Sequence, residues 1–318
     1  MMTFLNRWAL RSFLCLQLLL LLGCAATSPN VQLPQKEPST AYLKRLHPRV
    51  ILVLGSGSAR GFAHAGVLKA LEDNHIPIDM IVGTSAGSIV GALYADNPSA
   101  DSVEKILLKT QRNEVIDFSL MDLTQGPISG NGLQNFLITH LKAHNFEQLH
   151  IPFVAIATNL HSGELHVFGS GPIAPAVNAS SAAPPFFRPV SLYGKTYIDG
   201  GLIDPVAVDV AKRFHPALII AVSLNYPLSK SLPTNGPSVF LRGFDMMMIR
   251  LNNYSAAEAQ IIIRPEPVND VNMFDNTQGE TLMQIGFAAT EKAIPEIKKQ
   301  LARRHIALTP PDKTSETV

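Results

Sequence analysis

Two short apolar runs, each followed by a glycine-bearing turn and a helical pattern, constrain the fold of this chain most strongly. Val50–Leu54 is apolar throughout, as in a strand buried on both faces, and it leads into Gly55–Gly61. Ile76–Val82 is the second such run, and it leads into Gly83–Gly87. A strand–helix–strand–helix unit makes its two strands parallel neighbours. Both turns therefore lie at the carboxyl ends of the strands, where active sites of open α/β sheets form.

The rest of the chain continues the alternation of strands and helices, which predicts an α/β fold. We expect helices near 101–112, 131–144, 237–258 and 279–302. We expect further strands at Phe153–Thr158, Leu165–Phe168, Thr196–Asp199, Leu218–Leu224 and Ile261–Arg264. Gly163 is placed to turn the first two of these strands into a hairpin.

Composition excludes several functional classes. Hydrophobic residues make up 46% of the 318 residues and charged residues 16%, which excludes a disordered, highly charged protein. With 26 Lys+Arg against 25 Asp+Glu, the net charge of +1 does not indicate a nucleic-acid binder. Two cysteines are too few for a disulfide framework or a cysteine-rich zinc module.

Neither a cofactor nor a metal is expected. Gly55-x-Gly57-x-x-x-Gly61 matches neither a Walker loop nor a dinucleotide-binding fingerprint, because its third glycine is wrongly spaced and no lysine follows. His140 and His144 have the spacing of helical metal ligands. They lack the glutamate of a metalloprotease motif, so a solvated helix face is expected there.

The N-terminal residues have the pattern of a signal segment that is removed by cleavage. Arg7 and Arg11 precede Phe13–Leu22, an apolar run too short to span a bilayer well, which favours a secretory signal over residues 1–23. Leu21-Leu22-Gly23-Cys24 resembles a bacterial lipobox, which implies cleavage after Gly23 and lipidation of Cys24. The alternative is an ordinary signal or an N-terminal anchor helix.

The residues after Cys24 predict where the chain would be attached. Residues 24–48 are polar and rich in proline, as in a tether, and this length reaches about 80 Å when extended. By resemblance to bacterial lipoproteins, Ala25 in place of Asp favours the outer membrane over the inner membrane. We therefore expect a lipid-anchored protein that faces the periplasm.

Three motifs carry chemistry. Gly83-x-Ser85-x-Gly87 between a strand and a helix has the form of a nucleophile elbow, which exposes a serine at the positive end of a helix. The glycine-rich turn around Gly57 presents backbone N–H groups that suit an oxyanion or a phosphate, although a tight turn without a ligand is the alternative. Asp199-Gly200-Gly201 places a carboxylate beside two small residues, although an ordinary β-turn is the favoured interpretation when this motif is taken alone.

Together these motifs resemble the patatin-like phospholipases, a family that includes the neuropathy target esterase branch. The resemblance rests on four ordered segments: Leu54–Gly61 with His64–Leu68, Gly83–Ser88, Asn178–Ala182 with Pro184, Phe187 and Pro189, and Tyr197–Leu202. Ser56 and Ser58 depart from the pattern, because many members have glycine at these positions. The resemblance implies a three-layer sandwich with a mostly parallel central sheet and helices on both faces.

The resemblance also implies a mechanism. Ser85 would be the nucleophile and Asp199 would activate it directly, as a Ser–Asp dyad. Gly57 and Ser58 would supply the N–H groups of an oxyanion hole, and Arg60 would support their loop or contact a substrate phosphate. The expected substrate is the acyl ester of a phospholipid or lysophospholipid, and no protein partner is implied.

The resemblance further implies the domain layout. Residues 49–225 would form the catalytic domain, and 226–305 a helix–strand–helix extension packed on it. Residues 306–318 would form a polar tail.

Two rival functions remain open from the sequence. The first is a Ser–His–Asp esterase, for which only His215 and His305 follow Asp199 in the chain. His215 belongs to the link between a helix and the next strand, and is expected at the opposite end of the sheet. The second is a lipid- or partner-binding lipoprotein with an inactive hydrolase fold. His64 lies one turn into the first helix, where packing or surface exposure is expected more than a place in the site.

One further pattern has two interpretations. A stripe of large apolar residues follows helical spacing through the expected helix 237–258: Phe240, Phe244, Met247, Met248, Leu251 and Tyr254. Core packing is the default interpretation. A lipid-facing lid is the alternative, because methionine-rich surfaces are adaptable. The burial of these side chains distinguishes the two.

Overall fold

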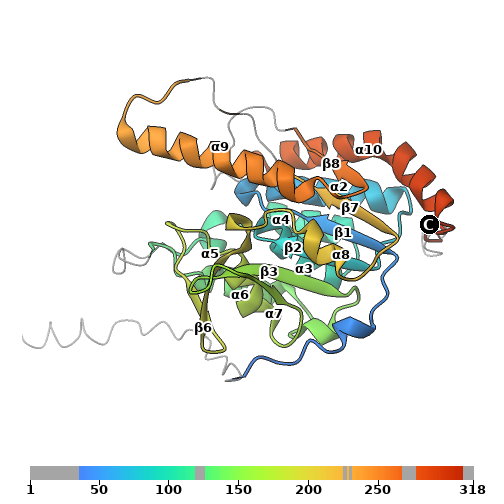
Figure 1. The fold of residues 1–318 in the computed structure, drawn as a ribbon, viewed down its shortest axis with the longest axis horizontal. Helices are drawn as coiled ribbons and strands as arrows, with labels where there is room; N and C mark the ends of the chain where they lie inside the picture. Colours follow the sequence, from blue (N-terminus) through green and yellow to red (C-terminus); the bar gives the residue numbers. More distant parts are fainter. Residues whose placement is uncertain (1–35, 119–125, 225–227, 229–230, 267–276, 311–318) are drawn as a thin grey trace, which may run out of the picture. The chain divides into compact units, whose positions relative to one another are not determined.

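The computed structural model describes residues 36–118, 126–224, 228, 231–266 and 277–310, which all belong to one unit, Leu33–Val318 (Figure 1). The predicted signal 1–23, the lipidation site Cys24, residues 25–35 of the predicted tether and residues 311–318 of the tail lie outside the described residues. Within the described part of the chain, no helix combines the length and the apolar character needed to cross a membrane.

A mixed sheet forms the centre of the unit, and among the described residues it has eight strands in the order β5-β6-β3-β2-β1-β7-β8, with β4 also paired to β3. The strands are β1 (Val50–Leu54), β2 (Met80–Thr84), β3 (Phe153–Asn159), β4 (Leu165–Phe168), β5 (Val190–Leu192), β6 (Lys195–Asp199), β7 (Leu218–Val222) and β8 (Ile261–Ile263). Strands β3, β2, β1, β7 and β8 are parallel, whereas β4, β5 and β6 run antiparallel to their neighbours. The expected α/β fold is confirmed.

Helices cover both faces of this sheet, which gives the three layers expected from the sequence (Figure 1). The α-helices are α2 (Phe62–Asp73), α3 (Ala86–Asp96), α4 (Ala100–Lys109), α5 (Arg112–Val115), α6 (Asn131–His140), α7 (Ile173–Ser180), α8 (Val208–Lys212), α9 (Gly236–Ala256) and α10 (Gly279–Arg303). Short 3-10 helices are η1 (Leu43–Arg45), η2 (Ser58–Gly61), η4 (Phe146–Gln148) and η5 (Gly200–Leu202).

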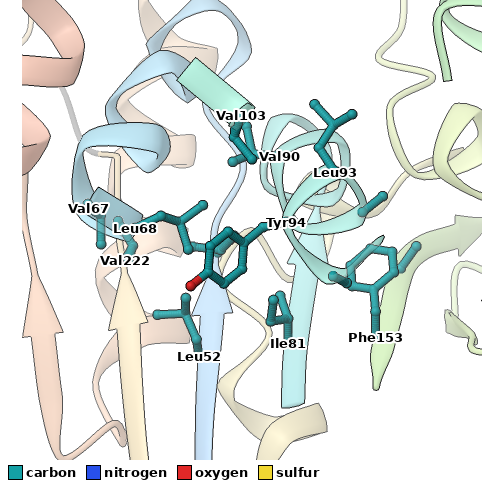
Figure 2. Packing of buried hydrophobic residues seen from close by; sticks show 14 of the residues in the cluster. Leu52, Val67, Leu68, Ile81, Val90, Leu93, Tyr94, Val103, Phe153 and Val222 are labelled. Atoms are coloured by element: carbon teal, nitrogen blue, oxygen red, sulfur yellow. The ribbon is translucent and has the colours of Figure 1, made fainter. Parts of the chain in front are cut away.

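Alternating side chains of the buried strands pack into two separate hydrophobic cores, one on each face of the sheet. Leu52 of β1 faces the core shared with α2, α3, α6, α7 and α10, whereas Ile51 and Val53 face the core shared with α8 and the end of α9. Figure 2 shows Leu52 and Ile81 of the sheet beside Tyr94 of α3 in the first core. Both faces of β1 and β2 are buried, so packing fixes the ends of the strands from which the two turns start.

Two expected helices end earlier than their sequence patterns indicate. The helix expected at 131–144 ends at His140, because the Asp96 carboxylate accepts the backbone N–H groups of Lys142 and Ala143, both at 2.8 Å. His144 therefore lies beyond the helix, and the two histidines do not share a helical face. The helix expected at 101–112 is divided into α4 and α5.

The described part of the predicted tether packs on the folded unit. The Leu43 side chain is buried, and the Tyr42 hydroxyl donates a hydrogen bond to the Gly169 carbonyl at 2.6 Å. Nearer the N-terminus, the Glu37 carboxylate accepts a hydrogen bond from His166 Nε2 on β4 at 2.7 Å. The chain is thus in contact with the sheet from about Glu37 onward, although its composition is polar and rich in proline.

The apolar stripe on α9 is exposed, so its interpretation as core packing is wrong. Phe240, Phe244, Met247 and Tyr254 are all exposed to solvent, and Met248 and Leu251 are half-buried. Only Asn252 and Ala256 of this helix are buried. The helical period of the stripe correctly predicted which side chains share a face, but not what that face meets.

Candidate active site

Ser85 lies at the sharp turn between β2 and α3, and its backbone adopts the strained conformation of a nucleophile elbow. Its φ is +53° with ψ −121°, an arrangement that non-glycine residues rarely adopt. The flanking glycines make room for the turn. A Cβ on Gly83 would lie 2.7 Å from the Gly87 carbonyl oxygen, and a Cβ on Gly87 would lie 2.0 Å from the Leu54 carbonyl oxygen. A larger residue at Gly83 would push α3 away from β2, and a larger residue at Gly87 would push α3 away from β1.

Ser180 at the end of α7 holds this strained backbone in place. Its Oγ accepts the Ser85 N–H at 3.1 Å and donates to the Ile156 carbonyl of β3 at 2.6 Å. The hydroxyl is fully buried, so both hydrogen bonds are formed away from competing water. The family resemblance included the segment 178–182 but gave Ser180 no role, because its partners are distant in sequence.

Asp199 ends β6, and the sheet register brings it to Ser85. Thr84, the residue before Ser85, is in register with Ile156 of β3, and Asp199 is in register with the next residue, Ala157. The Ser85 hydroxyl lies beside the Asp199 carboxylate and lowers its pKa as a hydrogen-bond donor. The Gly201 N–H donates a second hydrogen bond to Asp199 Oδ1 at 2.7 Å. A Cβ on Gly200 would lie 2.3 Å from the Ile156 carbonyl oxygen, so the Asp-Gly-Gly turn fits only without a side chain there.

Burial sets the protonation of this carboxylate. Asp199 is 5% exposed and Ser85 is 8% exposed. Loss of water raises the pKa of Asp199 from 3.8 to about 6, because an ionised carboxylate is poorly solvated in the interior. The hydrogen bonds from Ser85 and Gly201 oppose this increase by stabilising the charged form. Asp199 is therefore mostly ionised at pH 7 and able to accept a proton close to that pH.

The loop between β1 and α2 presents backbone N–H groups beside Ser85. The N–H groups of Gly55 and Ser56 donate to the carbonyls of Val222 and Pro205, at 3.0 and 2.8 Å, which pins the start of the loop. In contrast, no described backbone carbonyl accepts the N–H of Gly57 or Ser58. Ser58 has a φ of +51°, the left-handed conformation that glycine adopts without strain.

The Arg60 N–H closes the same loop by donating to the Gly57 carbonyl at 3.0 Å. Arg60 therefore contributes to the turn through its backbone. Its side chain is half-buried and does not line the cavity described below.

None of the histidines singled out in the sequence reaches the Ser85 hydroxyl as a base. His64 is fully buried on α2, and its Nε2 donates to the Gly55 carbonyl at 2.8 Å, so it supports the loop. Burial lowers the pKa of His64 to about 4, although the hydrogen bond to Gly55 opposes this shift. His215 precedes β7, at the amino end of the sheet, while Ser85 follows the carboxyl end of β2. Arg49 bonds the His305 carbonyl just before β1, which places His305 at that same amino end.

No group of three or more His, Cys, Asp or Glu side chains suited to a metal ion occurs among the residues that the structure describes.

A largely apolar cavity of about 190 Å³ opens beside Ser85. Ser58, Ser85 and Ser181 line it together with apolar side chains from α2, α3, α4, α5 and α6. The larger apolar residues of these helices are Phe62, Ile89, Val90, Leu107, Val115, Leu133 and Phe136, and Ile116 and Phe187 outside the helices also line the cavity. The polar side chains of Thr110, Gln111 and Arg112 line another part of the cavity wall. The sequence motifs did not indicate this cavity, because α4, α5 and α6 reach it only through tertiary packing.

Comparison with known proteins agrees with the site. The family model described as patatin-like phospholipase matches residues 52–212, about half of the chain, including the loop, the elbow and the Asp-Gly-Gly turn. The chain belongs to this family. Its relatives place it, more narrowly, beside the NTE branch of that family.

Three relatives illustrate the match. An uncharacterized NTE family protein of Mycobacterium tuberculosis is 35% identical over 180 residues, 56% of this chain and 49% of that protein. Human patatin-like phospholipase domain-containing protein 6 is 31% identical over 65% of this chain and 15% of its own length. Lysophospholipase nte1 of Aspergillus fumigatus is 32% identical over 71% of this chain and 15% of its own length. The chain thus spans about half or less of these curated relatives.

Among solved structures, VipD from Legionella pneumophila aligns with a TM-score of 0.47 at 14% identity, covering 79% of this chain and 67% of that chain.

The buried Asp199 charge predicts a pH-dependent gain in stability for Asp199→Asn. Because the folded-state pKa of about 6 exceeds the ordinary 3.8, stability is highest when Asp199 is protonated and falls as the pH rises from about 4 to 6. At pH 8 the wild type carries a cost of up to about 3 kcal/mol that the neutral amide avoids. Urea unfolding should therefore show the variant to be more stable at pH 8 but not at pH 4.

Asp101→Asn is the matched control, because this side chain is 75% exposed. It should show no comparable difference between the two pH values. A gain for Asp199→Asn of the same size at pH 4 and pH 8 would contradict the assignment of this cost to a buried charge.

Proposed function

We propose that this protein is a serine acyl hydrolase that cleaves the acyl esters of phospholipids or lysophospholipids with a Ser85–Asp199 dyad. The observation that carries the proposal is the position of Ser85, which lines an apolar cavity and is paired with the buried carboxylate of Asp199. Membership of the patatin-like phospholipase family supports the same class of reaction.

In the first step, Ser85 Oγ attacks the ester carbonyl carbon while its proton passes to the Asp199 carboxylate. A carboxylate is a weak base for an alcohol in water. The raised pKa of Asp199, about 6, reduces the difference in pKa between the carboxylate and the serine hydroxyl. The absence of water strengthens the hydrogen bond along which the proton moves. The tetrahedral intermediate carries a negative charge on the former carbonyl oxygen.

The N–H groups of Gly57 and Ser58 would receive this charge. Their freedom from described carbonyl partners and the place of Ser58 in the cavity wall support this role. One such donor is typically worth about 2.7–4 kcal/mol of transition-state stabilisation. Ser85 is the N-cap of α3, so the positive end of that helix adds to the favourable potential.

Collapse of the intermediate breaks the ester C–O bond, and Asp199 returns the proton to the departing alcohol. The acyl group then remains on Ser85 Oγ. A water molecule, deprotonated by Asp199, attacks this acyl-enzyme, and the fatty acid leaves as Ser85 recovers its proton. The same carboxylate acts as base and acid in turn, and no third titrating residue is required.

The cavity supports a lipid substrate. Its apolar wall from α2 to α6 suits an acyl chain, while Thr110, Gln111 and Arg112 offer polar contacts to the ester or the head group. The name of the Aspergillus fumigatus relative, a lysophospholipase, agrees with this class of substrate.

Substitutions at the dyad test this function. Fatty-acid release from phospholipid and lysophospholipid should fall by at least about a hundredfold in Ser85→Ala and in Asp199→Asn, because each removes one partner of the proton transfer. The rate in the wild type should rise with pH through about 6 as Asp199 ionises. His215→Ala is the control and should retain the full rate, because His215 lies at the opposite end of the sheet.

Loss of activity in His215→Ala with full activity in Asp199→Asn would instead support a histidine-dependent esterase. Equal fatty-acid release by the wild type, Ser85→Ala and Asp199→Asn would contradict the dyad.

We also propose that the protein is lipidated at Cys24 and held on the periplasmic side of the bacterial outer membrane. The support comes from the sequence alone: the apolar segment Phe13–Leu22, the tetrapeptide that ends at Cys24, and Ala25 after it. Attached acyl chains bury about 0.8 kcal/mol per methylene, and two or more chains hold a protein firmly on a bilayer. The enzyme would then act from the surface of a membrane that contains its substrate.

Mass spectrometry of the protein from bacterial membranes tests the anchor. The N-terminal peptide should begin at Cys24 and carry the mass of attached acyl chains. Cys24→Ala should abolish both the acyl mass and the cleavage after Gly23. A wild-type N-terminus that starts elsewhere, or a Cys24 without acyl chains, would contradict the anchor.

A further inference from the structure

Helix α9 is attached to the rest of the protein mainly at its C-terminal end. Asn252 and Ala256 are its buried residues, and Ala256 packs in the core with Ile51 and Val53 of β1. The Ser223 hydroxyl, directly after β7, bonds Asn252 Oδ1 at 3.4 Å. The last two turns of α9 are therefore fixed beside the carboxyl end of β7.

The remainder of α9 extends beyond the carboxyl end of the sheet. The helix connects the carboxyl end of β7 to the start of β8, which is parallel to β7, so α9 runs back toward the amino end of the strands. Its N-terminal part, Gly236–Leu251, spans about 24 Å at 1.5 Å per residue and comes before the turn that meets Ser223. Figure 1 shows this part of α9 continuing past β7 and β1. Ser85 lies at the same end of the sheet.

Helix α9 exposes an apolar face that runs along this extended part and continues to Tyr254 in the C-terminal turns. Phe240, Met247 and Tyr254 follow one another at seven-residue intervals, which aligns them along the helix, and they are 72%, 69% and 79% exposed. Val239, Leu241 and Met246 beside them are also more than half exposed. None of these side chains lines the cavity beside Ser85, so this face is not occupied in closing the active site. Single exposed apolar residues are ordinary, but a row of this size on one helix marks an interaction surface.

We propose that this face of α9 inserts into the surface of a phospholipid bilayer and sets the carboxyl end of the sheet against the membrane from which the substrate is taken. The proposal rests on the proposed lipid hydrolase function. It adds the surface by which the enzyme binds the bilayer that contains its lipid substrate.

The chemistry of the face favours a bilayer over another protein. Its side chains are aromatic residues, long aliphatic residues and methionines, which adapt to a disordered apolar phase without a matching shape. The charged residues of α9 are Arg242, Asp245 and Arg250, so the helix has an excess of positive charge that suits anionic lipid head groups.

Position provides the second argument for a bilayer. Ser58 and Ser85, which line the cavity, belong to the turns at the carboxyl end of the sheet, so we expect the membrane that holds the lipid to approach that end. The apolar face of α9 is presented there. A second copy of the chain or a protein partner on the same face would separate the cavity from the bilayer.

A tryptophan reporter tests the contact directly. The chain contains one tryptophan, Trp8, so Trp8→Phe leaves a background without tryptophan. Phe240→Trp in this background places the reporter on α9, and Leu308→Trp is the matched control. Leu308 is 42% exposed and is followed by Thr309, whose N–H bonds the His75 carbonyl before β2, at the amino end of the sheet.

Each full-length variant is reconstituted into phosphatidylcholine–phosphatidylglycerol vesicles with or without bromine atoms on the acyl chains. We expect the brominated chains to quench the Phe240→Trp reporter strongly and the Leu308→Trp reporter not at all. Equal quenching of both reporters, or no quenching of the reporter on α9, would overturn the proposal.

A second copy of the chain on this face would give a different result. The Phe240→Trp reporter would then be protected from aqueous acrylamide in proportion to the number of protein copies per vesicle, without quenching by bromine. This result would also overturn the proposal.

Activity supplies an independent measurement. Met247→Glu should lower hydrolysis of vesicle phospholipid by at least about tenfold, because a charge opposes insertion of the helix. Hydrolysis of a water-soluble short-chain ester should not change. Leu308→Glu should leave both rates unchanged. Parallel loss on both substrates would show damage to the fold and would contradict the proposal.

The two measurements separate this inference from the proposed function. Quenching of the reporter on α9 with no ester hydrolysis by the wild type would leave the membrane contact standing and refute the hydrolase. Hydrolysis of vesicle lipid with no quenching of that reporter would support the hydrolase and refute the membrane contact of α9.

Discussion

The pairing of Ser85 with the Asp199 carboxylate, out of contact with water, is the interaction on which the rest of this site depends. A buried carboxylate destabilises the fold unless it protonates or finds donors, and here Ser85 and Gly201 are the donors. The surrounding structure holds Ser85 in a strained backbone conformation, which keeps its hydroxyl beside the Asp199 carboxylate. Burial raises the pKa of Asp199 to about 6, close to physiological pH, and the ionised carboxylate lowers the stability of the fold.

The architecture explains how this strain is maintained. Strand β3 is in register with β2 up to Ile156 and with the end of β6 from Ala157, so one strand positions both partners. Ser180 ties the elbow to the same strand through the Ile156 carbonyl. The glycines at the close approaches allow these elements to touch. The α9 surface and the anchor proposed at Cys24 would then orient this rigid site toward lipid from two different parts of the chain.

The parts of the site that are encoded in continuous segments could be predicted from the sequence. The glycine-bearing turns, the elbow serine and the Asp-Gly-Gly turn are local patterns, and the parallel arrangement of β1 and β2 follows from their connection. Ser180, the bond from His64 to Gly55 and the cavity wall on α4 to α6 could not be predicted in this way. Their roles depend on partners that only tertiary packing brings together. The α9 stripe shows the same limit, because its period identifies a face but not what covers that face.

The most direct test of the dyad is covalent labelling of its nucleophile, in which both the modified residue and the rate of labelling are measured. The protein is treated with an alkyl fluorophosphonate, which forms a stable bond with an activated serine, and the modified peptide is sequenced by mass spectrometry. A single adduct on Ser85, formed at least about a hundredfold more slowly in Asp199→Asn at pH 8, is the expected result. An adduct on another residue, or equal rates of labelling in the two proteins, would contradict a serine activated by Asp199.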